Sequence, residues 1–279
     1  MRVDLCGVRG STPAPGRPFE RYGGHTSCVA LTHDGADAPT LILDAGTGLR
    51  EASGLLGGAP FAGTLLLSHL HWDHIQGLPF FGGGDHEGSE VSVVIPEQGT
   101  GQDALSVLKR AISPPFFPVA PDVLRGDWRF STLEPGSSAH GGFEVLAYEI
   151  PHKGGRTFGY RVSDGRTALT YMPDHFPTAL GPGPDGWGEY HDAAMALAAG
   201  SDVLVHDAQL TPAELAPQAA MGHSCGEYAA GLASRAGAKG VLLFHHRPDR
   251  TDEQIDALVA GFAADLPVTA ARQGATLLL

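Results

Sequence analysis

In the first half of the chain, apolar positions come in short runs separated by turns that are rich in glycine and proline. Runs of this length, alternating or fully apolar, are typical of β-strands. They predict strands at residues 2–6, 27–32, 40–43, 64–67 and 90–95. Residues 46–55 and 102–112 have the spacing of short helices, so this half is predicted to be mostly sheet.

In the second half, strand and helix patterns alternate. Strands are predicted at 142–150, 202–205 and 241–244, and a hairpin with arms 157–162 and 167–171 turns at Asp164-Gly165, a dipeptide that favours tight turns. Helices are predicted at 192–199, 224–236 and 251–264. Ser224 and Thr251 are the predicted N-caps, Ser224 with Glu227 in a capping box. The chain closes with an apolar run at 275–279.

No linker, repeat or charged block divides the 279 residues, so a single domain over residues 1–279 is expected. The N-terminus lacks the apolar core of a secretory signal, and no apolar stretch is long enough to span a bilayer. The cysteines, Cys6, Cys28 and Cys225, form no CxxC pair and are odd in number. These features predict a cytoplasmic protein with reduced, buried thiols and no membrane partner.

The formal net charge of −13 argues against a large nucleic acid as partner, because phosphate backbones are held by clustered lysine and arginine. A small anion remains possible where bound cations reverse the local field.

The candidate chemistry is concentrated in the stretch HLHWDH, directly after the predicted strand 64–67. It places His69, His71, Asp73 and His74 within six residues. Imidazole and carboxylate groups bind first-row cations such as zinc. His69 and His71 alternate along an extended backbone and can share one direction, while Asp73 and His74 begin a helix and can face a second position. The loop therefore predicts ligands for two metal ions.

Other predicted strands also end in ligating side chains. These are His152, Asp174, the pair His206 and Asp207, and the pair His245 and His246. A functional site is expected along the edge where these strand ends meet.

HLHWDH resembles the HxHxDH signature of the metallo-β-lactamase superfamily. The segment Asp44-Ala45-Gly46-Thr47-Gly48 after strand 40–43 is similar to a second element of that family, in which the aspartate braces the metal loop. An N-cap role for Asp44 is the simpler alternative. The resemblance implies an α/β fold, a four-layer αββα sandwich of two mixed β-sheets flanked by helices.

The resemblance also implies a ligand set for two divalent ions, zinc in the first place and manganese as the alternative. One ion would be held by His69, His71 and His152, the other by Asp73, His74 and His245, with Asp174 bridging the two. His245 is preferred to His246 because the family ligand directly follows the strand. Asp207 is the competitor of Asp174 for the bridging position.

Asp73, Asp174 and His245 together resemble the phosphodiesterase branch of the superfamily, which includes ribonuclease Z and cyclic phosphodiesterases. Residues 202–208 and 221–224 resemble two further elements of that branch. This implies that His223 lies over the metals, binds a phosphate oxygen or protonates the leaving alkoxide, and is oriented by Asp207. Helix capping without a catalytic duty is the alternative.

Two differences from the related phosphodiesterases restrict the range of expected substrates. Little more than one hairpin joins His152 to Asp174, which leaves no room for the arm of transfer-RNA-processing enzymes, and the cysteine-rich metal site of the phosphoribosyl enzymes has no counterpart. A small phosphodiester is therefore expected, with a cyclic nucleotide as the first candidate. A metal-bridging hydroxide would attack phosphorus. The alternatives are a metallo-hydrolase of esters, lactones or thioesters, and a non-catalytic metal-binding regulatory protein.

Two loops are candidate substrate contacts. Ser11 and Thr12 belong to a glycine-rich turn, residues 7–16, that can aim backbone amides at an anion or be a turn only. Phe116 and Phe117 follow two prolines on a stiff loop. They can line the substrate mouth, cover the sheet or form a homodimer contact.

Overall fold

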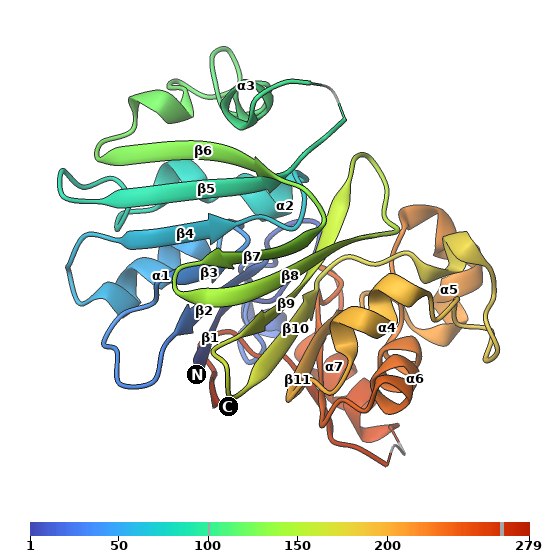
Figure 1. Cartoon of the computed structure of the whole chain (residues 1–279). Coiled ribbons are helices and arrows are strands. Elements are labelled where there is room, and N and C mark those ends of the chain that lie inside the picture. The colour runs from blue at the N-terminus through green and yellow to red at the C-terminus, as the bar shows by residue number, and fades with distance from the viewer. Residues whose placement is uncertain (100, 263–264) are drawn as a thin grey trace.

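Two mixed β-sheets pack face to face, with helices on both outer sides, in the computed structural model of the protein (Figure 1). The structure describes residues 1–99, 101–262 and 265–279. The first sheet has seven strands in the order β14-β1-β2-β3-β4-β5-β6, and the second has seven in the order β13-β12-β11-β10-β9-β8-β7. The predicted αββα sandwich is confirmed.

The strands of the first sheet come from the N-terminal half and the last residues of the chain. They are β1 (Arg2–Gly7), β2 (Cys28–Thr32), β3 (Leu41–Leu43), β4 (Ala62–Leu66), β5 (Glu90–Pro96), β6 (Asp127–Leu133) and β14 (Thr276–Leu278). Those of the second sheet are β7 (Gly136–His140), β8 (Phe143–Ile150), β9 (Thr157–Ser163), β10 (Ala168–Met172), β11 (Val203–Asp207), β12 (Val241–Phe244) and β13 (Val268–Ala270).

The α-helices are short, and most follow a strand. They are α1 (Leu49–Ala52), α2 (Trp72–Ile75), α3 (Ala104–Lys109), α4 (Asp192–Ala198), α5 (Pro212–Gln218), α6 (Gly226–Ala236) and α7 (Asp252–Ala260). The described chain contains no helix long and apolar enough to cross a membrane.

Alternation along the strands builds three apolar layers. Leu41 and Leu43 of β3 face the second sheet, whereas Ile42 faces α1 and α2 on the outside. In β11, Val205 faces the first sheet and Leu204 packs toward α4 and α6. Successive side chains of a strand point to opposite faces, so apolar strands can be buried on both.

Several predicted elements differ in extent. The predicted helix 46–55 is α1 followed by a 3₁₀ turn at Ser53–Leu56, and the helix at 102–112 is only α3. Helix 251–264 is α7, whose N-cap Thr251 forms a capping box with Gln254; residues 263 and 264 lie outside the described residues. Strands β6, β7 and β13 and helix α5 were not predicted.

The N-cap predicted at Ser224 is wrong. Helix α6 begins one residue later, with Cys225 at its N-cap and no side-chain capping bond. The backbone N–H of Ser224 instead donates to the Asp207 carboxylate at 3.3 Å. The three cysteines are free and buried.

Candidate metal centre

The site lies at one edge of the sandwich, where the carboxyl ends of several strands meet. In the first sheet β3 runs parallel to β4, so Asp44 follows β3 beside the loop that carries His69 and His71 after β4. In the second sheet β10, β11 and β12 are parallel neighbours. Their ends deliver Asp174, Asp207 and His245. In open α/β sheets, ligand sites form at such strand ends.

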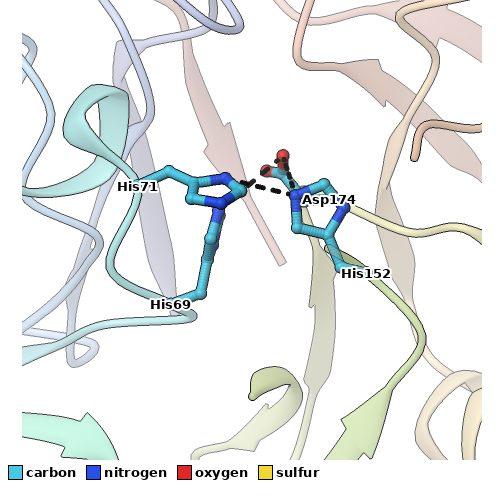
Figure 2. A group of neighbouring side chains, drawn as sticks. All are labelled: His69, His71, His152 and Asp174. Atoms are coloured by element: carbon cyan, nitrogen blue, oxygen red, sulfur yellow. Dashed lines mark hydrogen bonds and ion pairs between the residues drawn. The ribbon is translucent and has the colours of Figure 1, made fainter. Parts of the chain in front are cut away.

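Four of these side chains form a first group: His69, His71, His152 and Asp174 (Figure 2). One potential ligand atom from each lies within 4.8 Å of the others. His71 Nδ1 is 3.3 Å from His152 Nε2, and Asp174 Oδ1 is 3.4 Å from that same nitrogen. His69 Nε2 lies 3.9 Å from Asp174 Oδ1.

The other oxygen of Asp174 faces a second group, Asp73, His74 and His245. Asp174 Oδ2 is 3.0 Å from His74 Nε2 and 3.3 Å from His245 Nε2. Asp73 Oδ2 is 3.3 Å from His74 Nε2 and 3.1 Å from His245 Nε2. One carboxylate thus joins the two groups, an arrangement that suits two cations sharing a bridging aspartate.

The tautomers of two histidines show that these groups fit a cation. His152 Nδ1 lies 2.7 Å from the carbonyl oxygen of Gly222, which can only accept, so Nδ1 carries the hydrogen. His74 Nδ1 is 2.7 Å from Asp44 Oδ2 and donates for the same reason. In the neutral rings, the Nε2 lone pairs therefore point into the site. Within the described residues, His69 Nε2 and Asp174 Oδ2 are buried and make no hydrogen bond. Bare lone pairs gathered in this way suit a borderline cation such as zinc.

The protonation states also favour metal binding. Burial lowers the pKa values of His69, His71 and His152, which keeps these rings neutral. Burial alone would raise the pKa values of Asp73 and Asp174, but the surrounding imidazoles lower them. Neutral imidazole and ionised carboxylate are the ligating forms.

His74 behaves differently from the three neutral rings. Burial opposes its charged form, but Asp73 and Asp44 outweigh burial and raise its pKa. The same carboxylates that favour the charged ring would also favour a cation at its Nε2.

Asp44 braces the loop, as its resemblance to the family element implies. It is fully buried and accepts four hydrogen bonds, from Ser68 N at 2.6 Å, Ser68 Oγ at 2.8 Å, His74 Nδ1 at 2.7 Å and Tyr171 OH at 2.8 Å. Asp44 therefore fixes the orientation of His74 and ties the loop to the second sheet.

We expect Asp44→Asn to weaken metal binding by about 10- to 100-fold, the usual effect of removing a partner of a ligating histidine. All four groups donate to Asp44, and the amide nitrogen of asparagine cannot accept from them. Asparagine tolerates the left-handed backbone at this position (φ 60°), so strain is not introduced. Competition with a chromogenic chelator measures the affinity, with the exposed Asp37→Asn as matched control. An unchanged affinity would show that Asp44 only supports the fold.

Backbone strain is concentrated at the site. Within the described chain, the non-glycine residues with positive φ are Ser11, Asp44 and His245. Such conformations persist where the surroundings over-determine them, which is common at functional sites. Ser11 donates its backbone N–H to Asp73 Oδ2 at 2.7 Å. The amide predicted to face an anion therefore holds a carboxylate of the protein.

The residues predicted to contact substrate lie at different places on the surface. A hollow of about 420 Å³ lies over the two groups, and its lining includes Ser11, His71, Trp72, Asp174 and His223. The exposed Thr12 does not line this hollow. Phe116 and Phe117 line a neighbouring groove instead. Contact of Ser11, Thr12, Phe116 or Phe117 with substrate stays a prediction.

His223 stands over the metal groups with Asp207 behind it. Its Nδ1 is 2.9 Å from Asp207 Oδ2 and 3.7 Å from Asp174 Oδ1, and its ring stacks on His245 with centroids 5.0 Å apart. Burial opposes its charged form, but Asp207 outweighs burial and raises the pKa of His223 to about 9. Asp207 thus favours the protonated ring, the form that can donate a proton through Nε2.

The geometry distinguishes His245 from His246, and Asp174 from Asp207. His246 Nε2 is 2.8 Å from the carbonyl oxygen of Ala271 and lies away from the metal groups, whereas His245 joins them. Asp207 accepts from the backbone of His175 and Gln209 besides pairing with His223, so it is not the shared carboxylate.

Sequence reasoning missed Gln209 and the contacts of His175 behind the site. Gln209 is fully buried, and its Oε1 accepts from Ser11 Oγ at 3.3 Å. His175 lies between two other histidines. Its Nδ1 is 3.0 Å from His206 Nε2, and its Nε2 is 2.9 Å from His191 Nε2. In the sequence, His175 lies next to Asp174 and Gln209 lies two residues after Asp207, whereas nothing pointed to His191.

The fold and the site together define a protein of the αββα sandwich type with a candidate metal centre at its strand ends. The family model of the β-lactamase superfamily domain matches residues 39–246, most of the chain. The chain therefore belongs to the β-lactamase superfamily, and the resemblance predicted from HLHWDH is confirmed.

Alignments with similar proteins cover nearly the whole chain. A ribonuclease Z of Halorubrum lacusprofundi is 24% identical over 287 aligned positions, which cover 88% of this chain and 86% of the relative. The metallo-β-lactamase fold protein YhfI of Bacillus subtilis superposes with a TM-score of 0.72 at 17% identity, covering 99% of both chains. The short form of human tRNase Z gives a TM-score of 0.67 at 20% identity, covering 100% of this chain and 99% of its own.

Proposed function

We propose that the protein is a dinuclear metal-dependent phosphodiesterase that hydrolyses a small phosphodiester, with a cyclic nucleotide as first candidate. The observation that carries this proposal is the pairing of two groups of potential metal ligands around Asp174 with His223, which Asp207 holds at 2.9 Å beside the same hollow. Two positive centres suit an anionic phosphodiester, and a poised proton donor suits a poor alkoxide leaving group. The sequence similarity to a ribonuclease Z supports the same type of bond.

Bound ions, zinc or alternatively manganese, would supply an activated water as nucleophile and would offset charge on the phosphoryl oxygens. His69, His71 and His152 would hold one ion, Asp73, His74 and His245 the other, and Asp174 would contact both.

Asp207 holds the Nδ1–H of His223 and keeps the ring oriented. His223 Nε2–H then donates its proton to the leaving sugar oxygen as the P–O bond breaks, and Asp207 stabilises the ring while it is charged.

The substrate is proposed to be small for two reasons. The connection from His152 to Asp174 is occupied by the hairpin β9–β10, and the net charge of −13 disfavours a long phosphate backbone. This sets the proposed substrate apart from transfer RNA.

Assays of 3′,5′- and 2′,3′-cyclic nucleotides, with and without chelator, test the proposal. Turnover that is lost with chelator and restored by zinc or manganese is expected. Hydrolysis of none of these, together with metal-dependent hydrolysis of a lactone, ester or thioester, would move the protein to another hydrolase class. Metal binding without turnover of any substrate would favour a regulatory protein.

A further inference from the structure

Trp72 separates two hollows on the surface. It lies between His71 and Asp73 in the metal-binding loop, and its side chain is 75% exposed. It lines the hollow over the metal groups, and it also lines a second hollow of about 740 Å³. The two hollows are therefore neighbours that share Trp72 as a common wall.

We call this second hollow the aromatic groove; its apolar lining includes Trp72, Ile75, Phe80, Ile112, Phe116 and Phe117. Phe80 is 62% and Phe116 80% exposed. The rings of Phe80 and Phe117 meet edge to face with centroids 5.7 Å apart. Exposed aromatic side chains gathered on one surface mark a binding site more often than chance exposure does.

The groove also carries positive charge. Arg50 lies on its wall and forms no ion pair within the part of the chain that the structure describes. In a protein of net charge −13, an arginine without an ion pair at the groove favours a ligand that carries a negative charge elsewhere on the molecule, as a phosphodiester does. The size of the groove falls within the range of pockets for small organic ligands.

We propose that the aromatic groove binds a planar aromatic substituent of the phosphodiester, a nucleobase or an aryl group, while the phosphorus lies beyond Trp72 over the metal groups. Flat rings stack favourably on aromatic side chains, with little dependence on their hydrogen-bonding pattern. This inference rests on the proposed function. It makes the aromatic substituent the feature by which substrates are selected.

Two diesters with the same leaving group test the groove: p-nitrophenyl methyl phosphate and p-nitrophenyl phenyl phosphate. Both release p-nitrophenolate, so the leaving group is matched, and the phenylalanine variants below control for the different reactivity of the two phosphorus centres. We expect kcat/KM to favour the phenyl diester by about tenfold, the effect of stacking one ring on an aromatic side chain. Phe80→Ala and Phe116→Ala should bring this ratio toward one. Leu180→Ala, an exposed apolar residue outside the groove, should leave the ratio unchanged.

Binding of phenyl phosphate separates the proposal of the groove from the proposal of the phosphodiesterase reaction. It is followed by the change in Trp72 fluorescence, with Trp72→Phe as blank. Binding that Phe80→Ala weakens, without turnover of either diester, would retain the groove and reject the reaction. Turnover of both diesters at a kcat/KM that neither Phe80→Ala nor Phe116→Ala lowers would retain the reaction and overturn the groove. Phe80→Ala and Phe116→Ala could instead leave the kcat/KM ratio of the two diesters unchanged and convert a dimer to monomers in sedimentation. That result would identify the groove as an interface between copies of the chain.

Discussion

Replacing Asp174 with asparagine should lower activity by at least about 10³-fold and reduce the metal content from two ions per chain to one or none. Asp174 contributes one oxygen to each group, so its loss removes a ligand from both sites. Several kcal/mol of transition-state charge stabilisation depend on the ions, and each 1.36 kcal/mol is a factor of ten in rate.

The asparagine variant should remain folded, because the side chain keeps its shape and the three apolar layers are untouched. Circular dichroism and elemental analysis check these expectations, with Asp37→Asn as the surface control. Full metal content with full activity in Asp174→Asn would remove Asp174 from the site.

Replacing His223 with glutamine should lower kcat for an alkoxide leaving group by about 10²- to 10⁴-fold, the range expected for a general acid. The metal content should stay the same, since His74, His152 and His245 are retained. The loss should be much smaller for p-nitrophenyl esters, because p-nitrophenolate leaves without a proton.

The pH profile provides the second check on His223. Its raised pKa means that the ring carries the proton at neutral pH and loses it as the pH rises through that pKa. Wild-type kcat for an alkoxide leaving group should therefore fall on the alkaline side, and this limb should be missing in His223→Gln. The exposed His86→Gln serves as control. Equal losses for both kinds of leaving group would show that His223 binds the phosphate rather than protonating the leaving oxygen.

The site was largely predictable because its residues follow apolar strands. His152, Asp174 and His245 are far apart in the sequence, but each comes directly after a strand whose pattern is clear. Strands β6 and β7 were missed because they lie at the sheet edges, where polar and partly exposed side chains weaken the alternation.

Contacts between distant segments could not be predicted from local patterns. Ser11 was expected to face a substrate anion, yet its N–H is taken by Asp73, 62 residues away. Ser224 has the sequence of an N-cap, but Asp207 engages its backbone and the helix starts later. The left-handed backbone of Asp44 and His245 is likewise imposed by tertiary contacts, because neither residue type requires it.

Anomalous X-ray diffraction at the zinc edge, from crystals of zinc-loaded protein, tests most directly whether two cations lie on either side of Asp174. We predict two peaks, one bounded by His69, His71 and His152 and the other by Asp73, His74 and His245. A single peak, or peaks bound by other residues, would contradict the dinuclear site and the phosphodiesterase chemistry built on it.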